Sequence, residues 1–415
     1  MTQPFECDVA IVGSGLVGSA LACALDGTGM NVALIEAQAP RGGSGREAPQ
    51  VLAGPALDQP APDQRNLALG RRSVESLERI GVWQHAAVQG VPIREVHVSR
   101  RGDFGKLHLG VDALNLDAFG HTVPAPVLGE ALESRLRACG NLRRLQPARL
   151  EGWRSEHGKC LLEVLGPRGS EEIGARLIVA ADGTESGTRE RAGITVTRRD
   201  YAQTAIVGSV ALGREHEGRA FERFLDNGLV AMLPLAGRFS GFVWAMPMDD
   251  APAAMSWDDA SFMTELQSVF GSKLGAFKRI GKRQAWPLRA LTAQSLCAER
   301  LVLVGNAAQT LHPVGAQGFN LGLRDAITLA EEIVAAHREG RDIGSDNTLQ
   351  RFARRRKSDR DATVATSDAL IGLFGSSNAA IRFARSAALA AVERLPFIKR
   401  GLARRGMGYR REGAP

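Results

Sequence analysis

The sequence predicts an α/β protein in which a discontinuous Rossmann-like domain is combined with an antiparallel β-sheet domain and C-terminal helices. Three observations predict this fold class. A complete strand–turn–helix–strand pattern occupies residues 5–36. Two later buried-type strands, 176–181 and 301–304, are each followed by a turn of small, polar or acidic residues. Between and around them, 92–109 and 205–246 alternate with a period of two, which is typical of antiparallel strands.

The first stretch has the form of a dinucleotide-binding fingerprint. An apolar strand precedes Gly13-Ser14-Gly15-Leu16-Val17-Gly18, and a helix-like run, a glycine break at 27–29 and a second strand ending at Glu36 follow. Gly13 allows a tight turn, Gly15 lets the backbone approach a pyrophosphate, and Gly18 lets helix and strand pack. The helix N-terminus favours phosphate, and Glu36 can accept hydrogen bonds from a ribose diol. The pattern predicts a dinucleotide site without distinguishing NAD from FAD.

The remaining elements follow from periodicity and from glycine and proline breaks. Residues 39–64 are rich in Gly, Pro and Ala and predict a long loop. Beyond it we expect helices at 72–80, 127–139, 261–270 and 320–337, and strands at 93–98, 107–109, 151–164, 176–181, 205–212, 229–235, 239–246 and 301–304. The expected division is a nucleotide-binding domain of 1–91, 120–185 and 286–350, a substrate domain of 92–119 and 186–285, and a basic helical tail of 351–415.

Composition excludes several function classes. The formal net charge is +7, but 351–415 carries 15 Lys and Arg against 5 Asp and Glu, so the excess is local and a nucleic-acid-binding face is not indicated. The five cysteines form no C-x-x-C pair, which predicts neither a zinc site nor a disulfide framework. The chain shows no signal-type segment and no membrane-spanning run, so we expect it in the cytoplasm or peripherally on the inner membrane face.

Three motifs in order carry a resemblance to a known family. The fingerprint, Asp182-Gly183 and Gly305-Asn306 together resemble the class A flavoprotein monooxygenases. The stretch from Leu303 to Asp325 is more specific, and it resembles the ubiquinone-biosynthesis hydroxylases, closest to the 2-polyprenyl-6-methoxyphenol hydroxylase type. Asn306 stands where the wider class usually has Asp, which fits that branch. The order Gly315-Ala316-Gln317 differs slightly from the family's Ala-Gly-Gln.

The resemblance implies FAD as cofactor and assigns expected roles. Gly13, Gly15 and Gly18 would meet the pyrophosphate, Glu36 the adenosine ribose, and Arg65 a phosphate. Gly305 and Asn306 would lie near the ribityl chain, and backbone N–H groups of Gly318, Phe319 and Asn320 near the flavin ring; Asp182 is linked to FAD and nicotinamide binding. Structural alternatives stay open for several residues: Arg65 as a surface residue, Asp182 as a turn cap, and His312 as a packed loop residue instead of an acid or base. Tyr201 and Gln203 would line the substrate pocket or serve only as structural residues of the sheet.

The implied reaction is hydroxylation of a polyprenylated phenol, with O2 as co-substrate and NAD(P)H or another electron donor as reductant. The sequence names no catalytic residue, ring position or prenyl-chain length. Alternatives are a sister hydroxylase acting at another ring carbon, a flavin reductase or dehydrogenase, and a flavin-bearing structural subunit of a ubiquinone-biosynthesis protein complex. Oxygen-dependent product and activity of the purified protein separate these readings.

The tail predicts a further contact. Residues 378–395 have helical period, with Ile381, Ala384, Ala388, Val392 and Leu395 on one face, and Pro396 ends the run. Apolar and basic residues then alternate from 397 to 405. This composition suggests peripheral membrane contact, while packing on the nucleotide-binding domain or docking of a partner protein would also use it.

Overall fold

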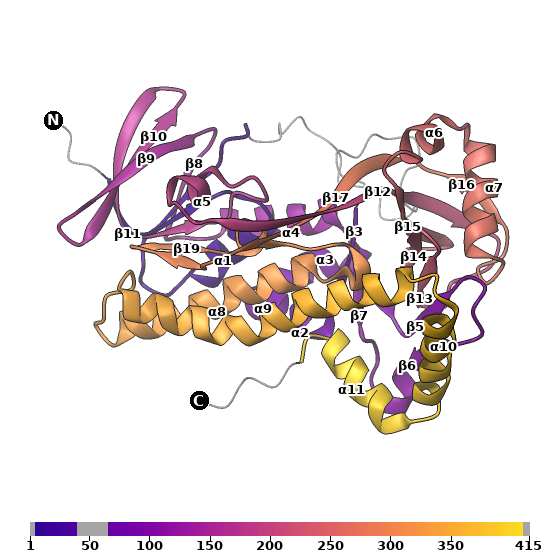
Figure 1. Cartoon of the computed structure of the whole chain (residues 1–415). Helices are drawn as coiled ribbons and strands as arrows, with labels where there is room; N and C mark the ends of the chain where they lie inside the picture. Colours follow the sequence, from indigo (N-terminus) through magenta and orange to yellow (C-terminus); the bar gives the residue numbers. More distant parts are fainter. Residues whose placement is uncertain (1–4, 40–64, 410–415) are drawn as a thin grey trace.

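The computed structural model describes residues 5–39 and 65–409, and Figure 1 shows two β-sheet regions joined along a layer of long helices. The loop expected at 39–64 lies outside the described residues except for its first residue. The predicted fold class is confirmed, because one sheet is largely parallel and the other largely antiparallel. No helix in the described ranges is long and apolar enough to cross a bilayer.

The first sheet has the order β18-β19-β11-β1-β2-β8, with β10 and β9 extending from β11. Its strands are β1 (Phe5–Val12), β2 (Val32–Ile35), β8 (Leu142–Leu145), β9 (Arg149–Glu156), β10 (Lys159–Gly166), β11 (Gly169–Ala180), β18 (Cys297–Ala298) and β19 (Leu301–Leu303). β1, β2, β11 and β19 are parallel, and their carboxyl ends coincide: Val12 lies opposite Ile35 and Ala180, and Ala180 lies opposite Leu303. The three predicted motifs therefore begin at one edge of the sheet.

Helices cover this sheet and close its core. The elements are α1 (Leu16–Ala24), α4 (Ala125–Arg137), α5 (Gly187–Arg191) and α8 (Gly318–Arg338). Fully buried Ile11, Leu34 and Val179 lie in the same apolar cluster as Leu323 of α8. Cys7 and Cys23 are buried in it as well, as small core residues.

The second sheet has the order β20-β17-β12-β15-β14-β13-β5-β6, with β16 beside β12. Its strands are β5 (Glu95–Arg100), β6 (Lys106–Gly110), β12 (Val196–Leu212), β13 (Arg219–Leu225), β14 (Gly228–Leu235), β15 (Phe239–Pro247), β16 (Phe277–Ile280), β17 (Gln284–Ala293) and β20 (Gln309–Thr310). α6 (Ala251–Ser256) and α7 (Asp259–Phe270) cover one face, where Phe242 and Trp244 pack against Phe262. β17 was not predicted from the sequence.

A small sheet, β3-β7-β4, connects the two regions. Its strands are β3 (Asn66–Gly70), β4 (Val91–Ile93) and β7 (Gly120–Pro124), and α2 (Arg71–Arg79), α3 (Trp83–Ala86), η1 (Ala87–Gln89) and η2 (Val111–Leu114) lie near it. Two more short 3-10 helices, η3 (Gly305–Ala307) and η4 (Val314–Ala316), belong to the turns that follow β19.

The chain ends in α9 (Asp346–Gly375), α10 (Ala379–Glu393) and α11 (Pro396–Gly406). α9 belongs mostly to the helical tail expected over 351–415, but its bounds were not predicted, and it runs along α8 in Figure 1. The helix expected over 378–395 is confirmed as α10, which Asn378 caps by accepting hydrogen bonds from Ala380 and Ile381 N–H groups. Pro396 begins a further helix, α11, as well as following the end of α10, since proline suits the first turn of a helix.

Candidate functional site

The three predicted motifs meet at the carboxyl edge of the parallel sheet. The backbone of Gly13 lies so close to the second motif that an added Cβ would be 2.5 Å from Ala181 O. Thr184 Oγ1 and Thr310 Oγ1 are 2.9 Å apart and connect the second motif to the third. An added Cβ at Gly305 would lie 3.1 Å from the Val17 side chain on α1. Segments distant in sequence thus form one continuous surface.

The three fingerprint glycines have different environments. Gly13 has φ +101°, which favours glycine, and it closes the turn after β1. A Cβ at Gly18 would overlap Gly13 O, so this glycine is needed for helix and strand to pack. A Cβ at Gly15 would meet no atom within 4 Å. Space is therefore open next to Gly15, where the fingerprint predicts that a pyrophosphate binds.

Glu36 folds back over the glycine turn. Its Oε2 accepts hydrogen bonds from Ser14 N at 2.8 Å and Ser14 Oγ at 2.9 Å, and its Oε1 accepts one from Gln38 N at 2.8 Å. The side chain is half-buried beside the start of α1. These bonds fix the carboxylate at the end of β2, where a ribose hydroxyl could reach it.

The third turn presents Asn306 to solvent and is fastened from beneath by Asp325. Asn306 is exposed, whereas Gly305, Ala307 and Ala308 on either side are buried. Asp325, 1% exposed, accepts hydrogen bonds from Gly305 N at 3.2 Å, Gln309 Nε2 at 2.6 Å and Arg356 Nε at 2.7 Å. This anchor had no signal in the sequence, since Arg356 lies in the part of the helical tail for which no helix bounds were predicted.

Asp182 and the buried Arg189 organise the second turn. The Asp182 carboxylate accepts hydrogen bonds from Ser186 Oγ and, at 3.0 Å, from Thr188 N, which is the capping arrangement of the structural alternative. Arg189 donates to Ala307 O at 2.9 Å and to Thr184 O at 3.0 Å, so it joins the second and third turns. Burial lowers the pKa of Arg189, although two backbone carbonyls accept hydrogen bonds from its guanidinium.

The loop before α8 is held against the second sheet by His312. Its Nδ1 accepts a hydrogen bond from Val314 N at 3.2 Å, and Nε2 lies 3.2 Å from Gln203 Oε1. Burial lowers the pKa of His312 to about 4, so the ring is neutral and Nε2–H is the donor. Tyr201 packs edge-on against it and donates to Asp368 on α9 at 2.8 Å. These contacts match the structural reading of His312, Tyr201 and Gln203.

The start of α8 combines an open backbone with a fully engaged side chain. A Cβ at Gly318 would meet nothing within 4 Å, and Phe319 is half-buried. The Asn320 amide accepts from Gly70 N (2.9 Å) and Ser73 Oγ (2.7 Å) and donates to Ala68 O (2.8 Å) and Ala316 O (2.9 Å). Its side chain therefore joins α8 to β3 and α2, and leaves the first-turn N–H groups as the groups available to a ligand.

Arg65 immediately precedes β3 and is exposed, with its guanidinium 5.7 Å from the Trp286 ring centroid on β17. This places the cation beside the second sheet, on the face that looks toward the small sheet: an added Cβ at Gly241 of β15 would contact the neighbouring Asn66 side chain.

Glu222 on β13 is a site residue that the sequence analysis missed. Its cross-strand neighbours are Val98 and Ala231, and the row continues through Val243, so a carboxyl group sits in an apolar, half-buried strip of the sheet. Gly315 N in the loop before α8 donates to Glu222 Oε1 at 3.0 Å. Burial raises the pKa of Glu222 to about 6, and the Gly315 N–H opposes that rise. Oε2 has no hydrogen-bond partner among the described residues.

Within residues 5–39 and 65–409, one cluster of three side chains has the donor atoms that a metal ion would need. Glu95 Oε2 lies 3.3 Å from His97 Nε2 and 3.2 Å from His108 Nε2, on β5 and β6. The two imidazoles stack with centroids 4.3 Å apart, and the carboxylate bonds to both, so the group satisfies itself without an ion. It shares no residue with the three motifs.

Comparisons with known proteins agree with this geometry. The chain matches a family model described as FAD binding domain over residues 55–366 and one described as NAD(P)-binding Rossmann-like domain over residues 11–61. It is 35% identical over 401 residues to the ubiquinone hydroxylase UbiL of Rhodospirillum rubrum, covering 97% of this chain and 89% of that one. It is 31% identical to the 3-demethoxyubiquinol 3-hydroxylase of Escherichia coli, covering 98% and 99%.

The fold has solved counterparts. The crystal structure of p-nitrophenol 4-monooxygenase from Pseudomonas putida matches with a TM-score of 0.76 at 19% identity, covering 98% of this chain and 100% of that one. This likeness shows the fold. The FAD binding domain model and the two relatives show that the chain belongs to the ubiquinone hydroxylase family of FAD-dependent aromatic monooxygenases.

Proposed function

We propose that the protein hydroxylates the ring of a polyprenylated phenol, specifically 2-polyprenyl-6-methoxyphenol, during ubiquinone biosynthesis. The proposal rests on the loop between β20 and α8, which joins two surfaces. One is the surface of the three nucleotide-binding motifs, and the other is the apolar strip of the second sheet that holds Glu222. The relatives named for ubiquinone hydroxylation span nearly the whole chain, which supports the same pathway.

FAD fits the residues present at the first surface. Open space lies over Gly15 and Gly318, next to the N-terminal turns of α1 and α8, where free N–H groups and the helix dipole favour anionic groups. Gly13, Gly15 and Gly18 would hold the pyrophosphate, Glu36 the ribose, and Arg65 a phosphate. Gly305 and Asn306 would hold the ribityl chain, Gly318, Phe319 and Asn320 the ring, and Asp182 would support the turn between them.

When bound, FAD would supply the redox chemistry by which NAD(P)H or another donor and O2 hydroxylate the ring. The chain's own contribution is to bind, orient and exclude water. The segments 1–91, 120–185 and 286–350 would carry the cofactor, and 92–119 and 186–285 the phenol. Neutral His312 would keep the loop between these parts in place without adding charge.

Glu222 is the group we assign to the phenol hydroxyl. One oxygen is fixed by Gly315 N, and the other is available in an apolar strip that would contact the ring. With a pKa of about 6 the carboxylate is largely ionised at neutral pH, so it can accept a proton or a hydrogen bond from the phenol. Increasing the electron density of the ring in this way favours attack on an electrophilic oxygen.

A sister activity is the second candidate, and a specific observation favours it. The E. coli relative is named for hydroxylation at position 3 of demethoxyubiquinol, a different ring carbon. Pocket shape decides ring position, and one fold accommodates several such outcomes. Membership of a ubiquinone-biosynthesis protein complex would be compatible with either activity.

Analysis of quinone intermediates in a strain lacking this protein tests the proposal. Accumulation of 2-polyprenyl-6-methoxyphenol, reversed by the wild-type chain, is the expected result. Accumulation of a demethoxyubiquinol would assign the sister activity instead. If ubiquinone content does not change, or if the Gly15→Val variant restores synthesis as well as wild type, the hydroxylase function is refuted. Incorporation of labelled O2 into product by the purified protein separates hydroxylation from reduction.

A further inference from the structure

An unusual concentration of exposed apolar side chains lies on the C-terminal helices and on the adjoining turn between β5 and β6. Within residues 5–39 and 65–409, ten large apolar side chains are strongly exposed, and seven of them form what we call the tail surface. Its members, with exposed fractions, are Phe104 (64%), Leu373 (46%), Ile381 (42%), Phe383 (68%), Leu395 (37%), Phe397 (69%) and Leu402 (37%). We propose that the tail surface docks onto an anionic lipid bilayer.

The orientation of α10 is the first argument, because this helix is turned the opposite way from an ordinary surface helix. Its charged residues are Arg382, Arg385 and Glu393, and all three face the protein. Arg385 is 3% exposed, whereas Phe383 and Ile381 are exposed together with the alanines at 380, 384, 387, 388 and 391. A helix that only packed on the protein would bury its apolar stripe and expose its charges.

A buried ion-pair cluster fixes this orientation. Asp103, whose side chain is 3% exposed, pairs with Arg385, with Arg382 Nη2 at 2.9 Å and with Arg100 Nη1 at 3.4 Å. Arg385 also donates to Leu373 O at the end of α9. Breaking a buried pair by removing one partner is strongly unfavourable, so α10 cannot rotate to hide its apolar face. Next to Asp103, Phe104 reaches Phe383 with ring centroids 6.0 Å apart.

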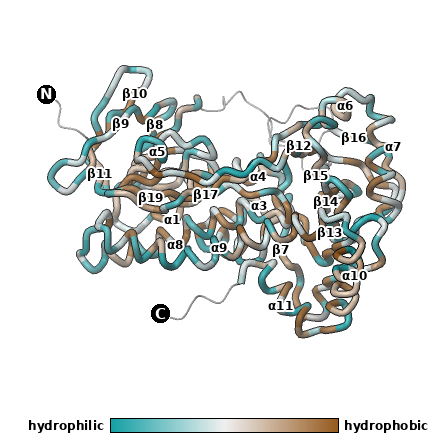
Figure 2. Tube along the Cα trace, in the orientation of Figure 1, coloured by the Kyte–Doolittle hydropathy of each residue, from teal (hydrophilic) through white to brown (hydrophobic). Residues whose placement is uncertain are grey.

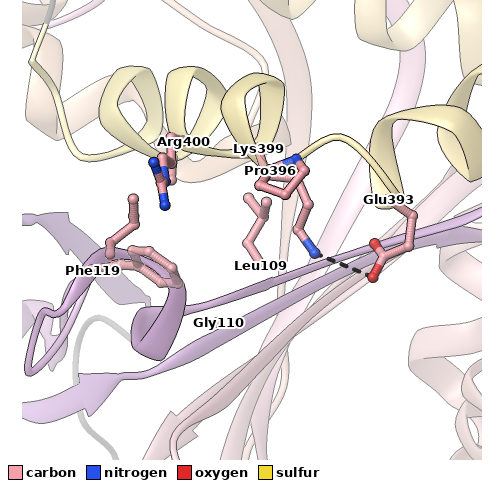
Figure 3. A pocket seen from close by; sticks show the side chains of 9 residues that line it. Leu109, Gly110, Phe119, Glu393, Pro396, Lys399 and Arg400 are labelled. Atoms are coloured by element: carbon pink, nitrogen blue, oxygen red, sulfur yellow. Dashed lines mark hydrogen bonds and ion pairs between the residues drawn. The ribbon is translucent and has the colours of Figure 1, made fainter.

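α11 adds positive charge beside the apolar side chains. Arg400, Arg404 and Arg405 are exposed and make no ion pair in the described part of the chain. Figure 3 shows Lys399 turned instead toward Glu393, at 3.2 Å, and Arg400 beside a cavity of about 110 Å³ whose lining includes Leu109 and Phe119. From 369 to 409 the sequence contains one acidic residue, Glu393, and Lys399 and His108 N already hold it.

These features specify the occupant. Exposed Phe and Leu side chains interleaved with unpaired arginines, without an exposed acid between residues 369 and 409, are the properties of helices that lie in the interface of an anionic membrane. Figure 2 shows hydrophobic residues along α10 and α11 at the lower end of the molecule. A lipid surface also suits a polyprenylated substrate, but the contact does not depend on which ring carbon is hydroxylated.

The test is vesicle co-sedimentation of the FAD-loaded full chain, with phosphatidylcholine alone or mixed with phosphatidylglycerol. The wild type should bind the mixed vesicles, and high salt should weaken binding. Replacing Arg400, Arg404 and Arg405 together by Gln should weaken it about a hundredfold, at about fivefold for each arginine. Phe383→Ser with Phe397→Ser should abolish it. Leu165→Ser with Met248→Ser is the control and should bind like wild type, because these side chains are also exposed, at 48% and 47%, but lie outside the tail surface.

Retained FAD and an unchanged melting temperature establish that each variant is folded. Three results would overturn the proposal: no binding of the folded wild type to mixed vesicles at low salt, equal binding by the Phe383/Phe397 variant, or a wild-type dimer that this variant dissociates while neither protein binds lipid. The last result would assign the surface to a second copy of the chain. Because no turnover is measured, failure here leaves the hydroxylase assignment to its own test.

Discussion

Replacing Asp325 by Asn should destabilise the protein and weaken FAD binding, although the two side chains have nearly the same shape. Asp325 Oδ2 accepts from Gly305 N and Gln309 Nε2, and Oδ1 accepts from Arg356 Nε. An asparagine has one acceptor oxygen and one NH2 group. Whichever way it turns, its NH2 group faces a donor, either on the Gly305 side or on Arg356.

The magnitude follows from the contacts. Loss of a charge-assisted hydrogen bond costs about 1.5–3 kcal/mol, and breaking a buried pair costs about 3–5 kcal/mol when the remaining charge has no partner. Arg356 keeps Asp359, with Nη2 2.8 Å from Oδ2, so we expect the lower end, about 3 kcal/mol. Release of Gly305 N loosens the turn that carries Asn306. One net hydrogen bond of about 1.4 kcal/mol corresponds to about tenfold in Kd for FAD.

Urea unfolding followed by circular dichroism, and titration of the apoprotein with FAD, measure the two effects. Asp361→Asn is the matched control, since Asp361 and its partner Lys357 are 53% and 75% exposed and surface pairs contribute little. If Asp325→Asn unfolds within about 0.5 kcal/mol of that control and binds FAD normally, the anchor reasoning is refuted.

Four further outcomes are expected. Gly15→Val should fold but lose FAD, whereas Gly18→Val should fail to fold, because an added side chain meets open space at the first glycine and the Gly13 carbonyl at the second; thermal unfolding with flavin absorbance distinguishes them. Asn306→Asp should retain FAD and Asn306→Leu should weaken it by about 1–3 kcal/mol in a fluorescence titration. Burial opposes ionisation of Asp359, but Arg324 and Arg356 outweigh it and hold its pKa below the usual value. The ionised carboxylate therefore stabilises the fold above about pH 4, and this contribution is lost as the pH falls through the lowered pKa. The stability of Asp359→Asn should consequently change less with pH in an acid titration. Hydroxylation should decline below about pH 6 as Glu222 is protonated, and Glu222→Gln should abolish this limb of the pH–rate profile.

The sequence predicted those elements in which the apolar residues recur at the positions that are buried in the structure. β1, β2 and β19 are continuous apolar strands in a sheet covered on both sides, and α8 has an inward apolar stripe, so local pattern and packing agree. The meeting of the three motifs followed from one rule, that parallel strands bring their carboxyl ends to one edge.

Where the buried residues of an element are polar, or its apolar residues are exposed, the hydrophobic pattern of the sequence did not predict how the element packs. α9 buries Leu349 and Phe352 near its start and Phe374 at its end, but the inward residues between them are Arg356, Arg360, Thr363 and Ser367. The middle of its buried stripe is therefore polar, and no continuous apolar helical period marks the helix. α10 was recognised by its period, but its apolar face points outward because Asp103, far away in sequence, holds Arg385. Glu222 had no local signal, since its character depends on a strip of neighbouring strands and on Gly315 in a distant loop.

The contact of Val17 with Gly305 and Gly322 has a consequence for biogenesis. The first glycine turn leaves the ribosome early, but the two glycines that pack against it are made only after most of the chain. Arg356, which fastens the third turn through Asp325, emerges later still. A nascent or truncated chain ending before α9 therefore has the fingerprint without the finished cradle, and acquisition of a flavin would report that synthesis of the helical layer is complete.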